Sequence, residues 1–97
     1  MQIRKLKTDS DVFQETWDGL KTYEVRLDDR NFAVGDILLL KETRYTGEEM
    51  KAGKPLVYTG RTVRCRVIQK LSGRYGLKDG WCILGISVLD RLVSAAR

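Results

Sequence analysis

Two stretches of the chain alternate apolar and polar residues with a period of two, which is the repeat of a strand with one buried face. The first covers residues 22–27, where Tyr23, Val25 and Leu27 alternate with threonine, glutamate and arginine. The second covers residues 61–71, where valine and cysteine alternate mainly with arginine. We expect the apolar residues of both stretches to face the core. An amphipathic helix would need an apolar repeat near 3.6 residues, so the chain is predicted to fold around a sheet.

Shorter patterns complete a β-rich α+β domain. Residues 37–41 and 81–88 are mostly apolar on both faces, as in strands that are covered on two sides. Together with residues 22–27 and 61–71, they predict one closed or nearly closed sheet. The residues expected to be buried in it are Val25, Leu39, Val67 and Leu84.

One or two short helices are expected beside the sheet. Residues 9–11 include favourable N-caps, and Asp11 has Gln14 three positions later as a capping-box partner. This helix is expected to end near Gly19, which can adopt the left-handed conformation. Residues 43–60 contain three glycines and the proline, and predict a flexible flap or a loose hairpin. Helical spacing predicts a second helix through Leu89, Leu92, Val93 and Ala96.

The length of the chain limits its organisation. With 97 residues and no linker-like segment, residues 1–97 are predicted to form a single domain with one core. No apolar stretch approaches the ~20 residues of a membrane-spanning helix. The positive charges near the N-terminus are not followed by the apolar stretch of a secretory signal. We therefore expect a cytoplasmic protein that does not associate with membranes.

Cys65 and Cys82 are the only cysteines, and the chain has no histidine. Both cysteines alternate with apolar residues, which predicts two buried thiols in adjacent strands. A disulfide is the alternative, although a reducing compartment would oppose it. Too few soft ligands are present for a zinc site, so no metal and no cofactor are expected.

The basic residues are concentrated in one part of the chain. The net charge is +5, from 18 basic and 13 acidic residues. Residues 61–78 contain six basic residues and no acidic one, so this segment alone carries +6. Such a concentration of charge attracts polyanions, above all nucleic acids. The alternative is a solvated strand face kept soluble by its arginines.

The segment that begins at Gly19 carries the most specific sequence signal. Residues 19–26 read Gly-Leu-Lys-Thr-Tyr-Glu-Val-Arg, and residues 35–36 form a Gly-Asp turn. With further blocks at residues 58–61, 75–77 and 84–86, the chain closely resembles the ASCH domains of the PUA-like superfamily, in a branch of short bacterial and phage-type proteins. The resemblance covers about residues 3–89 and leaves 90–97 as a short extension. It implies a small PUA-like (ASCH) β-barrel with a cleft beside the motif strand, where ASCH domains are proposed to bind RNA.

The resemblance implies that Lys21, Glu24 and Arg26 bind a ligand, and Arg30 is expected in the same cleft. Glu24 and Arg26 share one side of a strand, and Lys21 leads into it. Two cations beside a carboxylate suit a ligand that is anionic and also donates hydrogen bonds, such as a nucleotide. Alternatively, Glu24 and Arg26 form an exposed ion pair worth about 0–1 kcal/mol. If the three residues form a ligand cleft, Glu24→Gln is expected to change the selectivity among ligands and to leave the melting temperature nearly unchanged.

Further contacts to nucleic acid are expected from the basic segment. The candidates for phosphate contacts are Arg61, Arg64, Arg66 and Arg74. Tyr75 lies next to them in a glycine-rich stretch and is the candidate for stacking on a base. The alternative is that Tyr75 caps one end of the barrel.

Three classes of function follow, of which a non-catalytic module that binds RNA, another nucleic acid or a nucleotide is favoured. The second is an amidohydrolase acting on an acylated cytidine nucleoside, because some ASCH relatives have this activity. Their pattern pairs a lysine with a threonine three positions later, whereas Lys21 is followed by Glu24, and their distant glutamate has no counterpart in residues 61–78. If the chain were an enzyme, Lys21 and Glu24 would be the catalytic candidates. The third class is a protein-interaction or inhibitor module on the same scaffold.

Overall fold

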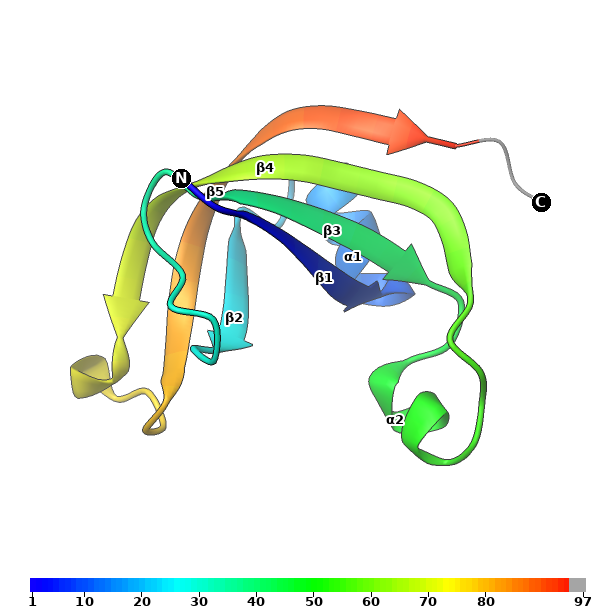
Figure 1. Cartoon of the computed structure of the whole chain (residues 1–97), viewed down its shortest axis with the longest axis horizontal. Helices are drawn as coiled ribbons and strands as arrows, with labels where there is room; N and C mark the ends of the chain where they lie inside the picture. The colour runs from blue at the N-terminus through cyan, green and yellow to red at the C-terminus, as the bar shows by residue number, and fades with distance from the viewer. Residues whose placement is uncertain (95–97) are drawn as a thin grey trace.

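Five strands form one sheet in the order β1-β3-β4-β5-β2 (Figure 1). The computed structural model describes residues 1–94, apart from the side chain of Arg74. The strands are β1 (Ile3–Asp9), β2 (Tyr23–Leu27), β3 (Ile37–Thr43), β4 (Tyr58–Ser72) and β5 (Trp81–Val93). Strands β1 and β3 are parallel, and the other neighbours are antiparallel.

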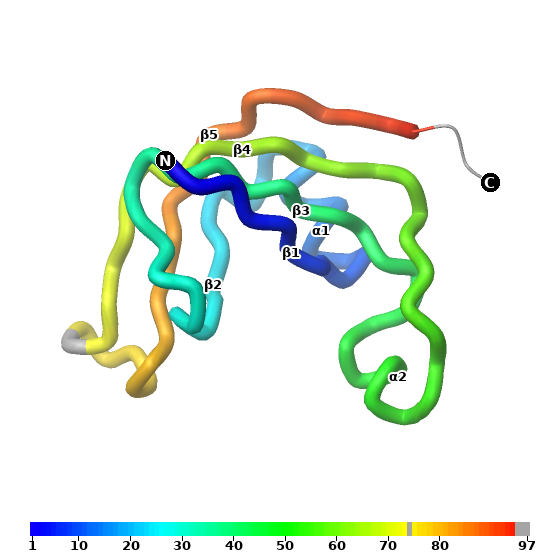
Figure 2. The backbone as a smooth tube through the Cα atoms, in the orientation of Figure 1, coloured from blue at the N-terminus to red at the C-terminus, as the bar shows by residue number. Residues whose placement is uncertain are grey.

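The sheet curls into a half-barrel with β1 and β2 at its two free edges (Figure 2). The four predicted strands are thus present, and residues 3–9 add a fifth. The sheet, expected to be closed or nearly closed, is an open half-barrel: within residues 1–94, β1 pairs only with β3 and β2 only with β5. None of the helices among residues 1–94 is long and apolar enough to cross a membrane.

Helix α1 (Ser10–Trp17) covers the inner side of the sheet and contributes Phe13 and Thr16 to the interior. Its N-cap is Asp9, so the predicted capping box at Asp11 is wrong. Its end is as expected: Gly19 has a φ of 80°, and its N–H donates to the carbonyl of Thr16. In this conformation the last carbonyls of the helix are satisfied.

Two shorter helical segments occupy the connections. Helix α2 (Gly47–Lys51) lies within the predicted flap, and Thr46 and Glu49 form a reciprocal capping box at its start. The 3-10 turn η1 (Gly73–Tyr75) lies between β4 and β5.

The core lies between α1 and the inner face of the sheet. Val67 and Leu84 are buried as predicted, whereas Leu39 is only half-buried. Cys65 and Cys82 are free, buried and in adjacent strands, so the prediction of two buried thiols is confirmed. Burial raises the pKa of Cys65 to about 12, so this thiol is protonated at neutral pH. The largest fully buried apolar side chains are Phe13, Leu38, Leu40, Leu84, Val63 and Val67.

Strand β2 is oriented opposite to the prediction. Tyr23, Val25 and Leu27 are 47%, 48% and 47% exposed, whereas Glu24 is 3% exposed. The expected burial of Val25 is therefore wrong. Glu24 lies opposite the buried Leu84 of β5 and faces inward with it. A carboxylate can occupy that position because two cations neutralise it, as described below.

Two further predictions are corrected by the long hairpin of β4 and β5. An irregularity between Val67 and Gln69 shifts the alternation of β4, so Lys70 lies opposite Leu84 on the inner face and not beside Arg66. The predicted helix at Leu89 is instead strand, because β5 continues to Val93 and pairs with the start of β4. Residues 90–93 thus belong to the sheet, and Ala96 lies outside the described residues.

A buried ion pair joins β3 to β4. Both carboxylate oxygens of Glu42 accept hydrogen bonds from Arg61, at 2.9 Å each, and the Thr59 hydroxyl donates a third at 2.6 Å. Glu42 is 5% exposed. The guanidinium of Arg61 also lies 5.1 Å from the Phe13 ring centroid and 4.9 Å from that of Trp17. Arg61 therefore connects the strands to α1.

Acid is expected to destabilise the fold through Glu42 and Asp36. Hydrogen bonding to Arg61 outweighs burial and lowers the pKa of Glu42 below its ordinary value of 4.5. Burial alone would raise the pKa of Asp36, but backbone N–H groups of Gln2 and Ala33 donate to it, and the net pKa lies below 3.8. A lowered carboxyl pKa gives stability that is present above the unfolded pKa and lost as the pH falls through the folded pKa. Thermal unfolding between about pH 6 and about pH 3 should therefore show a smaller decline for Glu42→Gln than for the wild type. Equal declines would contradict this role of Glu42.

Candidate functional site

The two free edges of the sheet face each other and are bridged by arginine side chains. Arg26 of β2 donates through Nη2 to the Lys7 carbonyl of β1 at 3.1 Å. Arg30, just after β2, donates through Nη1 to the Lys5 carbonyl at 2.9 Å. Arg4 of β1 donates in return to the Arg30 carbonyl at 2.8 Å. We call this boundary between β1 and β2 the seam. Its arginines occupy carbonyls that an unprotected edge strand would leave unpaired.

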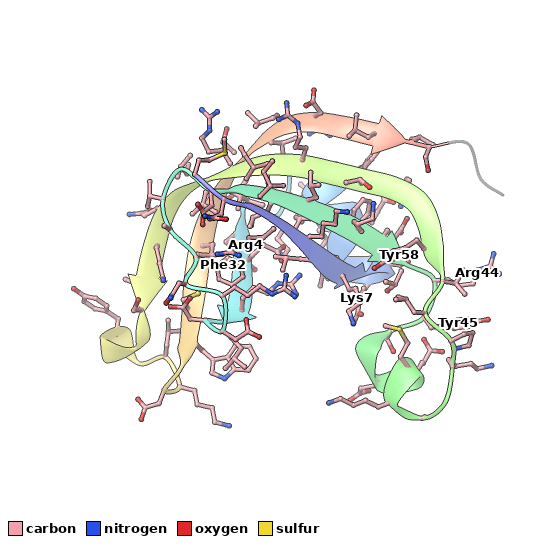
Figure 3. The ribbon with its side chains drawn as sticks, in the orientation of Figure 1. Arg4, Lys7, Phe32, Arg44, Tyr45 and Tyr58 are labelled. Atoms are coloured by element: carbon pink, nitrogen blue, oxygen red, sulfur yellow. The ribbon has the colours of Figure 1, made fainter. Side chains whose placement is uncertain are left out.

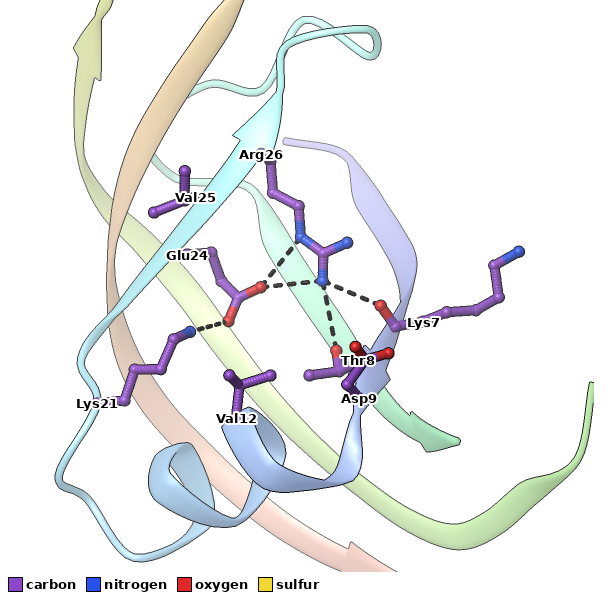
Figure 4. A pocket seen from close by; sticks show the side chains of 8 residues that line it. All are labelled: Lys7, Thr8, Asp9, Val12, Lys21, Glu24, Val25 and Arg26. Atoms are coloured by element: carbon purple, nitrogen blue, oxygen red, sulfur yellow. Dashed lines mark hydrogen bonds and ion pairs between the residues drawn. The ribbon is translucent and has the colours of Figure 1, made fainter. Parts of the chain in front are cut away.

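Glu24 is the centre of a three-residue ion-pair network beside the seam (Figure 4). Its Oε2 accepts from the Lys21 ammonium at 2.7 Å, and its Oε1 accepts from Nε of Arg26 at 3.1 Å. The side chains of Lys21 and Arg26 are 13% and 26% exposed. The network is therefore a buried carboxylate between two partly solvated cations. Glu24 and Arg26 do form the ion pair of the alternative, but Glu24 is buried and also binds Lys21, so the pair is not an exposed one.

The loop between α1 and β2 positions Lys21. Its ammonium donates to the Tyr23 carbonyl at 2.6 Å and lies 5.0 Å from the centroid of the Tyr23 ring. Arg26 is fixed on the opposite side by the Lys7 carbonyl and by the Thr8 hydroxyl, 3.4 Å from Nη2. Among the described residues, no acceptor is bonded to Nη1 of Arg26. Both cations are thus held in place and retain free N–H groups.

A cleft of about 350 Å³ opens onto this network between β1, α1 and β2 (Figure 4). A cavity of about 320 Å³ adjoins it on one side and reaches Arg30 and Trp81. Another of about 520 Å³ adjoins it on the other side and reaches Met50 and Lys51 of α2. Arg26 lines all three. We refer to these three adjoining cavities as the seam groove.

The seam groove is positively charged. Five basic residues line it against three acidic ones, and Glu24 is paired with two of the five cations, Lys21 and Arg26. The basic residues are Lys7, Lys21, Arg26, Arg30 and Lys51, and the acidic ones are Asp9, Glu24 and Asp29. Low-dielectric walls concentrate the field of such charges within a cleft.

The basic segment of residues 61–78 does not form one surface. Arg61 faces α1 and binds Glu42, whereas Arg64 is half-exposed and pairs with Asp90 of β5 at 2.6 Å. Lys70 pairs with Asp28 at 2.7 Å. Acidic residues of other segments therefore offset half of the six positive charges. Arg66 is exposed and outside these pairs, and the side chain of Arg74 lies outside the described residues.

The structure brings together four of the predicted ligand residues and separates the stacking candidate from them. Lys21, Glu24, Arg26 and Arg30 all lie along the seam. Tyr75 is 60% exposed in η1 and lines a different cavity, beside Lys70 and Ser72.

The sequence analysis did not single out Lys7, Lys51 or Trp81 as members of this site. Lys7 belongs to the site because β1 lies next to β2 across the seam. The curl of the sheet brings these two strands together, and no local sequence pattern shows it. Trp81 could have been found from its position at the start of an apolar strand that follows a glycine.

Hydroxyl groups for a hydrolase are poorly placed in the seam groove. Thr59 donates to Glu42, and Thr22 lines a separate cavity beside β5. Thr8 lines the cleft but is 4% exposed and lies near the Arg26 guanidinium. No acidic residue of β4 or β5 lines the groove among the described residues. The same residues contain no group of three or more acidic or cysteine side chains arranged to hold a metal ion.

A known protein family matches the part of the chain that contains this site. A family profile described as "Domain of unknown function (DUF3850)" matches residues 3–86. The chain belongs to this family. The DUF3850 match extends from the start of β1 into β5 and includes every residue of the seam groove. Among curated proteins, none matches the chain.

Proposed function

We propose that this DUF3850 domain binds single-stranded nucleic acid, RNA in particular, with its nucleotide units in the seam groove. The observation that carries the proposal is the Lys21–Glu24–Arg26 network at the cleft of about 350 Å³. A buried carboxylate holds two cations in fixed positions facing a space in the size range of small-ligand pockets, about 300–1,000 Å³. Sites fixed in advance lose less entropy when they bind.

The chemistry of the network suits a phosphate group. A guanidinium offers planar, paired N–H donors that match phosphate oxygens, and the free Nη1 of Arg26 provides such a donor. The Lys21 ammonium has three N–H groups and uses two of them for Glu24 and the Tyr23 carbonyl. The third remains for a ligand. Glu24 acts as a positioning residue in this arrangement, because its oxygens are occupied by these cations.

The ends of the groove offer contacts for neighbouring nucleotides. Trp81, which is 37% exposed, lines one end together with Phe32, and Lys51 lines the other. Stacking of a base on an aromatic side chain contributes about 1–3 kcal/mol. The resemblance to ASCH domains supports the same site, because its motif strand is β2 and its proposed ligand is RNA. We accordingly propose that this half-barrel is a variant of the PUA-like fold.

The proposal is tested by reversing charge inside and outside the groove. Lys7 and Lys51 are exposed cations of the groove, whereas Arg44 and Arg66 are exposed cations elsewhere, and Arg44 points away from the domain (Figure 3). Lys7→Glu/Lys51→Glu and Arg44→Glu/Arg66→Glu change the net charge equally. We expect the groove pair to weaken binding of a short fluorescent RNA by tenfold or more, roughly, and to reduce the salt slope by about 1.4. The control pair should weaken binding much less.

Fluorescence anisotropy at two or more salt concentrations measures both quantities, and circular dichroism confirms that each variant is folded. Equal losses of affinity in the two double variants would show attraction by net charge alone and would contradict a site in the groove. A greater loss in the Arg44/Arg66 variant would place the contact on another surface.

A further inference from the structure

Asp29 is the one acidic residue of the seam groove whose carboxylate has no partner within residues 1–94. The other two have partners: Glu24 is held by two cations, and Oδ1 of Asp9 accepts from the N–H of Gly47 at 3.1 Å. An unpaired negative charge repels phosphate groups, so Asp29 weakens the attraction of the groove for a phosphate backbone. Its position in the groove is explained if it binds a part of the ligand that donates hydrogen bonds.

The neighbours of Asp29 fix its backbone. The N–H of Asp28 donates to the carbonyl of Gly80, just before β5, at 2.7 Å. On the other side, Arg30 donates through Nη1 to the Lys5 carbonyl of β1 at 2.9 Å. The backbone is therefore held on both sides of Asp29, while the Asp29 side chain is exposed to solvent. A carboxylate whose backbone is fixed in this way loses less entropy when a ligand binds.

Asp29 lines the cavity of about 320 Å³ together with mostly apolar side chains. Leu6 and Phe32 are buried walls of this cavity, and Trp81 contributes a partly exposed aromatic ring. A nucleobase has two apolar faces and polar edges, so apolar walls with one free carboxylate suit a base better than a phosphate. Arg26 lines both this cavity and the central cleft. A nucleotide whose phosphate binds Arg26 can therefore place its base beside Asp29.

The four bases differ in what their Watson–Crick edges offer to a carboxylate, which accepts two parallel hydrogen bonds. Guanine presents two adjacent donors on this edge, N1–H and the N2 amino group. In adenine, cytosine and uracil, the donor on this edge lies next to an acceptor, which repels the second carboxylate oxygen. A single strand leaves these edges accessible. Within the described residues, Nε and Nη2 of Arg30 have no acceptor, so they can donate to O6 of the same guanine.

We propose that this cavity is a base pocket specific for guanine, in which Asp29 accepts from N1–H and N2–H and the Trp81 ring stacks on the base. The inference rests on the proposed function, because it assigns a base to a groove that binds RNA. It adds a sequence preference, which contacts to phosphate do not provide. Asp29 is thus the specificity-determining residue, whereas Lys21 and Arg26 bind the phosphate backbone.

Fluorescence anisotropy with short oligouridylates that carry one changed base tests the pocket. Guanosine at the changed position should bind the wild type roughly tenfold more tightly than adenosine, cytidine or uridine. Inosine, which lacks the 2-amino group, should lose most of this gain. 7-Deazaguanosine keeps both donors and should bind like guanosine. Equal affinity for the four bases, or equal losses with 7-deazaguanosine and inosine, would overturn the guanine pocket alone. Absence of binding by every oligonucleotide would contradict the proposed function as well.

Asp29→Asn keeps the shape of the side chain and removes the pair of acceptors. The preference for guanosine should fall to about twofold or less. Plain oligouridylate should bind equally well or better, because a negative charge is removed from the groove. The control Glu15→Gln removes the same charge from an exposed position of α1 and should keep the preference. If Asp29→Asn, shown by circular dichroism to be folded, kept the full preference, the pocket would be wrong even with RNA bound in the groove.

The two tryptophans report where the base lies. Trp81 lines the proposed pocket, whereas Trp17 packs against the core and lines none of the three cavities of the groove. In spectra of the ¹⁵N-labelled protein, the indole N–H signal of Trp81 should shift as the guanosine-containing oligonucleotide saturates, and that of Trp17 should shift little. An unchanged Trp81 signal at saturation would exclude stacking in this cavity and overturn the inference.

Discussion

Arg61→Ala is expected to lower the free energy of unfolding by about 3–5 kcal/mol, the cost of removing one partner from a buried ion pair. The substitution leaves the Glu42 carboxylate, 5% exposed, with hydroxyl donors such as Thr59 but without its counter-charge. It also removes the guanidinium from the rings of Phe13 and Trp17, and with it a contact between β4 and α1. Urea denaturation measures the loss.

The control for Arg61→Ala is Arg66→Ala on the same strand. Arg66 is exposed, so its removal should change the free energy of unfolding by no more than about 0.5 kcal/mol. Replacement of both Arg61 and Glu42 by methionine should cost less than Arg61→Ala, because no uncompensated charge then remains. A loss below about 1 kcal/mol in Arg61→Ala would show that the pair is not a structural connection.

Glu24→Gln is expected to lower the free energy of unfolding by about 2–3 kcal/mol. The amide keeps the shape of the side chain but leaves Lys21 and Arg26 without their counter-charge, in a position that is 3% exposed. The loss should be smaller than in Arg61→Ala, because both cations are partly solvated. For a domain of this length the melting temperature should fall by roughly 10–20 °C.

Glu15→Gln is the matched control, since Glu15 is an exposed residue of α1. Differential scanning calorimetry of the two variants and the wild type gives the comparison. An unchanged melting temperature in Glu24→Gln would agree with the exposed ion pair that the sequence suggested, and would contradict the buried network.

The positions of the strands could be predicted from sequence, but not the face that each presents. Alternation in residues 22–27 separates Val25 from Glu24 without saying which is buried. Glu24 can be buried because Lys21 binds its carboxylate and Arg26, which also binds it, is held by the Lys7 carbonyl. Lys7 lies 19 residues from Arg26 along the chain, so this contact is not visible in the local sequence. The irregularity after Val67 has no local signal either, and it moves Lys70 to the inner face.

The predicted C-terminal helix shows the limit of short apolar patterns. Leu89, Leu92 and Val93 fit a helical spacing, but the long strand β4 provides hydrogen-bond partners as far as Arg61, opposite Val93. Tertiary pairing therefore prevails over a pattern of four residues.

The charge of +6 in residues 61–78 overstated the positive charge of the surface, because three of its six cations pair with acidic residues. Its partners Glu42, Asp90 and Asp28 lie on other segments.

The candidate site was predicted in part. The motif strand brought Lys21, Glu24, Arg26 and Arg30 together, as the structure does along the seam. The side of the cleft formed by β1 could not be predicted, because β1 lies beside β2 only after the sheet curls. Lys7 therefore became a candidate only from the fold.

Chemical-shift mapping tests the binding of RNA in the seam groove most directly. Titration of the ¹⁵N-labelled protein with a short single-stranded RNA should produce saturable shifts at the backbone amides of Lys7, Thr8, Lys21, Glu24 and Arg26, the residues of the central cleft. The amides of Arg64 and Arg66, away from the groove on β4, should shift little. Saturable shifts confined to β4 around Arg64 and Arg66, or no saturable shift at the cleft, would contradict the proposed site.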